Sequence, residues 1–337
     1  MPLLVKKEKL EFLRNYYRDE GRLLSWPVIF ILPAWIESWW SVFGEVSYKT
    51  ALRSVWQGEE LIGLAPLMFQ NKTARLIGSA DVCDYLDFIT KPGFEKEFIN
   101  ALLAALSAEG ITRLELESQR PEAVVFSGYF AADNFKNTRA SYTLNNLSSE
   151  ISLASSWDNY LLSLNKKQRH EVRRKLRKLE NESDSFRYEV IGETGCGKAG
   201  DPVTFIPRFL ELFYENPDKA DFMTERMKKF FQTLIRNTST AGLSRYGLLE
   251  VNGEPAAAVL YFVYDGRIYL YNSGYHSNYA HLSVGLLSKI LSIRDSVERG
   301  YAVFDFLKGP EIYKSRLGGK AVPNYNVVIE LGPGGGD

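Results

Sequence analysis

The chain has 337 residues, of which 45% are hydrophobic and 13% aromatic, so it can bury more than one core, and its length favours two domains. Lysine plus arginine equals aspartate plus glutamate at 41 each, so overall charge indicates neither a DNA nor a membrane partner, and any such contact must come from a local patch. Cys83 and Cys196 give no disulfide framework and show no zinc spacing with the three histidines, so we expect a reducing compartment and no metal site.

The N-terminal segment is charged and indicates a helical arm over residues 1–25 rather than a basic and apolar leader. The apolar run Trp26–Ile36 that follows is interrupted by Pro27 and Pro33 and is too short to span a bilayer. We therefore expect no transmembrane segment and a cytoplasmic protein, either free or peripheral to the inner membrane.

Two similar strings lie about one domain apart, as internal repeats do. Leu52–Phe69 and Leu248–Phe262 each read as a strand, a Gly-Glu turn and a longer apolar strand, and Asn252-Gly253 is a strong hairpin signal. A third strand, a helix and a last strand follow in both halves, over residues 75–78, 95–109 and 111–117, and then 267–273, 283–299 and 301–306.

Aromatic side chains at helical spacing predict core-facing helices upstream of each hairpin, and they include Trp35 and Trp39, Phe205 and Phe209, and Phe230 and Phe231. The sequence thus predicts two pseudo-repeated α/β domains, over residues 26–150 and 183–331, joined by residues 151–182. The glycine-rich tail, residues 332–337, has no side chains to pack and is predicted to be disordered.

The joining segment contains a basic helix, with eight lysines and arginines between Lys166 and Lys178 and Glu171 as the one acid among them. An apolar stripe, Val172, Leu176 and Leu179, gives it a buried side. The helix is either merely solvated or binds an anion such as a cofactor phosphate, a sugar nucleotide, tRNA or a phospholipid surface. The residues that we expect to contact that anion are Arg169, Arg173 and Arg174.

The segment Phe304–Gly318 runs from an apolar strand into a loop that carries an acid, several bases and a phenol, at a place where α/β proteins put ligands. It resembles acyltransferases of the CelD type, relatives of the Fem aminoacyl transferases, in which Phe-Asp-Phe-Leu-(Arg/Lys)-Gly leads into a Tyr-Lys pair. Asp84–Phe88 is similar to a second pattern of that family, with Cys83 in place of a serine.

This resemblance covers residues 26–331 and implies an α/β (α+β) fold of two tandem GNAT-like domains, each a mixed, largely antiparallel sheet flanked by helices. It implies that Tyr313 and Lys314 lie at the transferred acyl group, where a lysine cation would stabilise a developing oxyanion. The alternative for Lys314 is a solvated loop residue. Asp305 is either a general base or the ion-pair partner of Lys308 or Arg316.

The helix start at Ser283, Val284 and Gly285 is a candidate donor-binding site, together with Lys308, because free backbone amides at a helix start bind phosphate. GNAT enzymes carry Gln/Arg-x-x-Gly-x-Gly/Ala there, and this chain keeps only Gly285. The donor is therefore acyl-CoA or, as in Fem relatives, aminoacyl-tRNA, unless this is an ordinary capped helix. His276 either accepts a proton from the acceptor or is incidental.

Two further motifs leave alternatives open. Asp84 and Asp87 are separated by two residues, with Tyr85 between them, and the three either bind acceptor hydroxyl groups or anchor a domain interface. Gly192–Lys198 fits Gly-x-x-x-x-Gly-Lys, but Ala199 replaces the magnesium-binding Ser/Thr, so we interpret it as a connector rather than a nucleotide site.

The sequence as a whole predicts an acyltransferase without a metal. It would transfer an acetyl group from acetyl-CoA to an amine or hydroxyl of a small-molecule, glycan or lipid-linked acceptor, such as a cell-envelope or polysaccharide precursor. The alternatives are a Fem-like transferase that uses aminoacyl-tRNA, and a recognition or scaffold protein that keeps the fold without catalysis.

Overall fold

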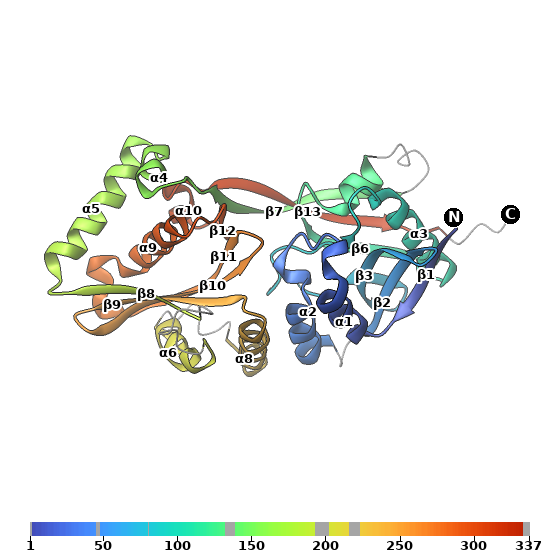
Figure 1. Cartoon of the computed structure of the whole chain (residues 1–337), viewed down its shortest axis with the longest axis horizontal. Coiled ribbons are helices and arrows are strands. Elements are labelled where there is room, and N and C mark those ends of the chain that lie inside the picture. Colours follow the sequence, from blue (N-terminus) through green and yellow to red (C-terminus); the bar gives the residue numbers. More distant parts are fainter. Residues whose placement is uncertain are drawn as a thin grey trace. The chain divides into compact units, whose positions relative to one another are not determined.

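The computed structural model describes residues 2–44, 48–79, 81–131, 139–192, 202–215 and 223–332 (Figure 1). The chain forms two compact units. Unit 1 comprises residues 1–146 and 323–337, and unit 2 comprises residues 147–322. Strands β7 (Ala140–Ser152) and β13 (Lys320–Glu330) each begin in one unit and end in the other.

Unit 1 is a mixed sheet with helices. Its strand order is β1-β2-β3-β4-β6-β13, and β4 and β6 are the parallel neighbours in an otherwise antiparallel series. Its elements are β1 (Leu3–Glu8), α1 (Leu10–Glu20), η1 (Gly21–Leu23), η2 (Ile29–Ile31), α2 (Pro33–Trp39), η3 (Trp40–Gly44), β2 (Lys49–Gln57), β3 (Glu60–Gln70), β4 (Thr73–Leu76), β5 (Ile89–Thr90), α3 (Glu95–Ala108), β6 (Arg113–Gln119) and η4 (Phe126–Phe130).

The N-terminal segment differs from the expected helical arm. It opens with strand β1, which pairs antiparallel with β2, and only then forms α1. Polar contacts hold this charged strand at the edge, since Lys7 forms an ion pair with the Glu109 carboxylate at 3.0 Å and Ser54 donates a hydrogen bond to Glu8 at 2.9 Å. Helix α1 buries Leu13, so the arm is part of unit 1.

Unit 2 repeats this plan. Its strand order is β7-β12-β11-β10-β9-β8, with β11 and β12 as the parallel neighbours. Helix α9 covers one face of the sheet, and α6 and α8 cover the other (Figure 1). Its elements are α4 (Trp157–Ser163), α5 (Lys166–Glu182), β8 (Phe186–Ile191), α6 (Pro202–Tyr214), α8 (Glu225–Thr240), β9 (Ser244–Val251), β10 (Glu254–Tyr264), β11 (Arg267–Tyr275), η6 (Ser277–Leu282), α9 (Val284–Glu298), β12 (Val303–Lys308) and α10 (Ile312–Arg316).

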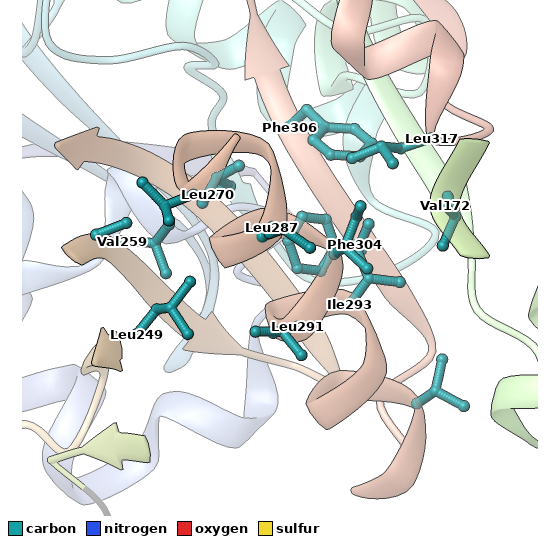
Figure 2. Packing of buried hydrophobic residues seen from close by; sticks show 14 of the residues in the cluster. Val172, Leu249, Val259, Leu270, Leu287, Leu291, Ile293, Phe304, Phe306 and Leu317 are labelled. Carbon is teal, nitrogen blue, oxygen red and sulfur yellow. The ribbon is translucent and has the colours of Figure 1, made fainter. Parts of the chain in front are cut away.

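The core of unit 2 fixes the helices that frame the candidate site. In Figure 2, Leu287 and Ile293 of α9 point into the layer formed by strand residues such as Phe304. The basic helix α5 joins this core through the predicted stripe, in which Val172 and Leu179 are buried and Leu176 is half-buried. Burial of this stripe holds α5 against α9.

The repeat is confirmed by the sheet of each unit. The β9–β10 hairpin turns at Asn252 and Gly253, both with positive φ (53° and 82°), as a two-residue type I′ turn requires. In both units a hairpin leads to a third strand, a helix crosses over, and the next strand returns parallel, through α3 in unit 1 and α9 in unit 2. The predicted α/β fold with mixed, largely antiparallel sheets is therefore confirmed.

The compact units differ from the expected domain ranges at the C-terminus. Residues 323–331, expected in the second domain, lie in unit 1 because β13 pairs antiparallel with β6, for example Glu330 with Arg113. The basic helix, expected as a link, lies inside unit 2. Residues 193–198 of the Gly-x-x-x-x-Gly-Lys motif, and 333–337 of the tail, lie outside the described residues.

Two features are absent from the described residues. Over those residues no helix combines the length and the apolar character needed to cross a membrane. In the same part of the chain, no group of three or more His, Cys, Asp or Glu side chains is placed to hold a metal ion.

Candidate functional site

The parallel strands β11 and β12 part in unit 2. They pair only from Arg267 to Tyr269 and from Val303 to Asp305, after which β11 continues to Tyr275 beside β10 alone. Strand β12 bends away at Leu307, whose φ is 61°, and its register with β7 shifts there. A bend of this kind opens a crevice at the carboxyl ends of the parallel strands, where open α/β sheets bind ligands.

A cavity of about 360 Å³ lies at this parting, and we call it the strand cavity. It is enclosed by the end of β11, the start of α9 and the region of α10. The residues that line it are Ser273, Gly274, Tyr275, Ala280, Ser283, Val284, Gly285, Leu286, Lys289, Glu311 and Tyr313. Four residues predicted from the sequence are thus brought together, namely Ser283, Val284, Gly285 and Tyr313.

Tyr313 lines the strand cavity with a mostly buried ring. The ring packs edge-on against Phe306, with 5.9 Å between the centroids. Burial raises the pKa of the phenol well above its ordinary value. The hydroxyl is therefore protonated at neutral pH and can donate a proton or a hydrogen bond into the cavity.

Lys289 is a residue of the cavity that the sequence analysis missed. It is 7% exposed, and its ammonium donates to Ser273 Oγ at 3.0 Å and to the Gly285 carbonyl at 2.7 Å. It also lies 5.2 Å from the centroid of the Tyr313 ring. A charged group is buried at a large cost unless it is hydrogen-bonded, so this lysine is held in place at the cavity wall. A signal was present, because it is the one charged residue between Val284 and Ile293.

Glu311 is a second residue that sequence reasoning passed over. Of the described residues that line the strand cavity, it has the one carboxylate. Its carboxylate lies 3.0 Å from the ammonium of Lys314. The cavity therefore contains a carboxylate that can accept a proton and a phenol that can donate one.

The start of α9 differs from the expected capped helix. Ser283 stands at the N-cap position with φ of 63°, but its side chain caps no amide and instead accepts a hydrogen bond from Lys175 at 2.5 Å. At Gly285, a Cβ atom would lie 2.9 Å from the Tyr275 ring, so the glycine makes room for that ring.

His276 caps a different helix. Its Nδ1 accepts a hydrogen bond from the Asn278 amide at 3.2 Å at the start of η6, and the residue is absent from the lining of the strand cavity. This contact favours the local structural role over proton transfer.

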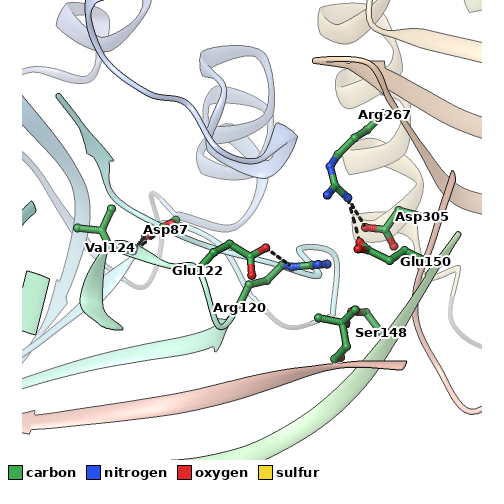
Figure 3. A network of polar contacts seen from close by, with 9 residues as sticks. Asp87, Arg120, Glu122, Val124, Ser148, Glu150, Arg267 and Asp305 are labelled. Atoms are coloured by element: carbon green, nitrogen blue, oxygen red, sulfur yellow. Dashed lines mark hydrogen bonds and ion pairs between the residues drawn. The ribbon is translucent and has the colours of Figure 1, made fainter. Parts of the chain in front are cut away.

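Asp305 forms a contact other than those expected. It is fully buried, accepts from the Leu307 amide at 2.7 Å, and lies 4.0 Å from the guanidinium of Arg267, which also binds Glu150 at 3.0 Å (Figure 3). Asp305 thus contacts Arg267 on a neighbouring strand, and its expected ion pair with Lys308 or Arg316 stays a prediction. The Arg267 side chain comes from the neighbouring strand β11, two positions before Tyr269, which is the residue that pairs with Asp305. Asp305 thus stabilises the bend at Leu307 and does not line the cavity.

Lys314 is neither solvated nor free to move. Only 3% of the residue is exposed, and its ammonium donates to the carbonyls of Leu307 (3.1 Å), Lys308 (2.6 Å) and Gly309 (3.3 Å). The alternative of a solvated loop lysine was wrong, because the bend after β12 turns three carbonyls toward it. Lys308 contributes a carbonyl to this cluster, and the residue is not among those that line the strand cavity.

The three candidate residues in unit 1 are buried. Asp87 accepts hydrogen bonds from the amides of Phe88 (2.7 Å) and Val124 (3.0 Å), and burial raises its pKa to about 8 (Figure 3). Tyr85 is 1% exposed beneath the Arg120 guanidinium, 4.8 Å away, and Asp84 is 6% exposed.

The two acids do not lie on a strand. Asp84 and Asp87 are three positions apart, which would place them on opposite sides of an extended segment, and in the structure neither belongs to a strand. The expectation that these residues bind acceptor hydroxyl groups stays a prediction. Asp87 anchors the backbone of its own unit.

The basic helix lines a groove of about 1000 Å³ beside α4, which we call the basic groove. Its lining residues are Trp157, Asp158, Leu161, Lys166, Lys167, Arg169, His170, Arg173, Leu176, Arg177, Glu180 and Arg294. Of the predicted contacts, Arg169 and Arg173 lie here, whereas Arg174 forms a two-pronged pair with Glu171 at 2.8 and 2.7 Å. Within the described part of the chain, Lys166, Lys167 and Arg173 have no ion-pair partner.

The fold of the chain is similar to that of several solved structures. The crystal structure of FemX superposes with a TM-score of 0.64 at 11% identity, over 96% of this chain and 96% of that chain. L-PGS from Bacillus licheniformis gives a TM-score of 0.53 at 10% identity, over 87% of this chain and 90% of that chain. The C-terminal domain of a protein assigned as a lysylphosphatidylglycerol synthetase from Agrobacterium fabrum gives 0.53 at 10%, over 88% and 87%. At these identities the likeness shows the fold.

No curated protein matches the chain. Residues 166–315 match the family described as an acetyltransferase (GNAT) domain. The matched segment contains helix α5, the parted strands, the start of α9 and the strand cavity. Residues 166–315 are therefore similar to an acetyltransferase domain of the GNAT type, and this match supports an acyltransferase.

Proposed function

We propose that the protein transfers an acyl group, in the simplest case acetyl, from acyl-CoA to an amine or hydroxyl acceptor, with the thioester bound in the strand cavity. The observation that carries this proposal is the parting of β11 and β12 over a cavity bordered by the start of α9, inside the segment that matches the GNAT domain. The cavity lies beside the carboxyl ends of the parallel strands, where open α/β sheets bind ligands.

The groups in the cavity suit direct transfer. The acceptor nitrogen or oxygen attacks the thioester carbonyl carbon and gives its proton to Glu311. The carbon–sulfur bond then breaks, and Tyr313 gives its phenol proton to the leaving thiolate. The acyl group ends on the acceptor and CoA leaves as a thiol, so no covalent enzyme intermediate is needed.

Buried cations support this pair of groups. The Lys289 ammonium, 5.2 Å from the ring centroid, stabilises the phenolate that Tyr313 becomes. Lys314 positions Glu311 by its 3.0 Å ion pair and holds the bend after β12, and Asp305 holds the same bend through the Leu307 amide. In this proposal Asp305 and Lys314 act through their neighbours.

The acceptor is proposed to be a cell-envelope or polysaccharide precursor that carries phosphate, handled in the cytoplasm or at the inner face of the membrane. The resemblance to CelD-type proteins supports this class of acceptor. The unpaired cations of Lys166, Lys167 and Arg173 in the basic groove support a phosphate-bearing one.

The same unpaired cations favour one second candidate, a transferase that takes its acyl group from aminoacyl-tRNA. A polyanion that binds along α5 would be held by such a row of bases, and its affinity would fall steeply with salt. A scaffold without catalysis would bind neither donor productively.

Calorimetry with acetyl-CoA, followed by transfer assays with a panel of amine and hydroxyl acceptors, tests the proposal on the full chain. We expect acetyl-CoA to bind and turnover to fall in Glu311→Gln while binding persists. Absence of acetyl-CoA binding, with transfer from aminoacyl-tRNA to an acceptor, would show the second candidate to be correct. Absence of both activities would leave the scaffold.

A further inference from the structure

A second cavity lies between α5 and α9, and we call it the helix cavity. Its volume is about 810 Å³. The residues that line it are Asn165, Lys167, Gln168, His170, Glu171, Val172, Arg174, Lys175, Ser283, Leu286, Ile290, Arg316 and Leu317. Ser283 and Leu286 also line the strand cavity, so the two cavities meet at the first turn of α9.

The helix cavity is strongly positive. Four cationic side chains line it, Lys167, Arg174, Lys175 and Arg316, against the single carboxylate of Glu171. Glu171 pairs with Arg174 and also lies 3.8 Å from the Lys175 ammonium, and Arg316 is exposed without an ion-pair partner among the described residues. The Lys175 side chain is only 16% exposed and points at Ser283 Oγ, 2.5 Å away, where the two cavities meet. A polyanion at this place would thus find Lys175 and Arg316 facing it.

These cations are held in position by the packing of α5. Val172 enters the core beside Leu317, as Figure 2 shows. The helix begins with a capping box between Asn165 and Gln168, and Gln168 also donates to the Ser315 carbonyl of α10 at 2.8 Å. Binding therefore need not order α5, which lowers the cost of fixing a charged ligand.

We propose that the helix cavity binds the phosphate groups of the donor, with Lys175 and Arg316 as their cationic contacts. This inference rests on the proposed function, in which the acyl end of the same molecule occupies the strand cavity. The cations of α5 and α10 take the place of the glycine-rich pattern of which the chain keeps only Gly285. One side of α5 then serves the donor, and the side that lines the basic groove is left for the acceptor.

The test compares donors with and without phosphates. Calorimetry measures acetyl-CoA, and ligand-observed NMR measures acetyl-pantetheine, which has the same thioester and no phosphate, because its affinity will be low. We expect Lys175→Gln with Arg316→Gln to weaken acetyl-CoA binding by about tenfold or more, since each loses a charge-assisted contact, and to leave acetyl-pantetheine binding unchanged. Glutamine at position 175 retains a donor for Ser283.

Arg173→Gln is the matched control, because Arg173 lies on the same helix, is exposed, and lines the basic groove instead of the helix cavity. It should leave both affinities unchanged. Unchanged acetyl-CoA affinity in the double variant, or equal weakening of both donors, would overturn this inference and leave the proposed function standing. If the parent protein does not bind acetyl-CoA, this inference and the proposed function are both wrong.

Discussion

Replacing Lys314 by methionine tests whether this buried ammonium holds the bend that opens the strand cavity. The substitution keeps the length of the side chain and removes a cation that donates to three carbonyls and pairs with Glu311. A hydrogen bond to a charged group contributes about 1.5–3 kcal/mol, and carbonyls near the surface regain water when it is lost. We therefore expect the free energy of unfolding to fall by about 2–4 kcal/mol in total, less than the sum of the contacts.

Urea denaturation followed by fluorescence measures this change, and a thermal melt should show the midpoint lowered by about 5–12 °C for a unit of this size. Lys166→Met is the control, because Lys166 is exposed and has no ion-pair partner in the described residues, so it should change the free energy by less than about 0.5 kcal/mol. Acyl transfer should also fall in Lys314→Met, since Glu311 loses its partner. A stability equal to that of the control variant would refute the role assigned to this ammonium.

Three further changes have expected outcomes. Tyr313→Phe should lower kcat by about 10²-fold and leave the Kd for acetyl-CoA unchanged, because the substitution removes only the proton that the thiolate receives. A parental kcat in stopped assays would exclude Tyr313 as the general acid. Burial raises the pKa of Asp87 to about 8, so the folded state keeps a proton that the unfolded state releases near pH 4. The free energy of unfolding should therefore decline between about pH 4 and pH 8, by at most about 1.4 kcal/mol per pH unit. Asp87→Asn should flatten that decline in urea titrations across this range, and an unchanged slope would count against the assignment. Gly274→Ala should destabilise unit 2 by more than about 2 kcal/mol, since its Cβ would lie 2.4 Å from the backbone of Leu212 in α6, and a parental melting curve would contradict this packing.

The fold could be predicted because its signals are local and repeated. The Asn252-Gly253 turn fixes one hairpin, and the crossing helix of unit 1 was expected at residues 95–109 and runs Glu95–Ala108. The sequence did not predict the pairing of strands that are far apart in the chain. Nothing near residues 323–331 indicates that β13 pairs with β6, and the lysines of β1 made a strand look like a charged helix.

Part of the candidate site follows from the sequence motifs, because the structure brings Tyr313 and the start of α9 to one cavity. The charged residues Lys289 and Glu311 of that cavity were not expected. The burial of Lys314, however, depends on the positive φ of Leu307. The sequence does not predict that φ, because leucine rarely adopts positive values. The partner of Asp305 could not be found by proximity in sequence, since Arg267 reaches it from the neighbouring strand.

Two buried lysines explain why the pattern in this chain differs from a glycine-rich donor loop. Lys289 fastens the first turn of α9 to β11 through Gly285 and Ser273, and Lys314 fastens the bend after β12. The two walls of the strand cavity are thus fixed by ammonium groups that are largely excluded from water and cannot supply charge to a phosphate without breaking these contacts. A donor with phosphates must then find its cations elsewhere. Within the described residues of unit 2, the helix cavity offers Lys175, beside Ser283 where the two cavities meet, and Arg316.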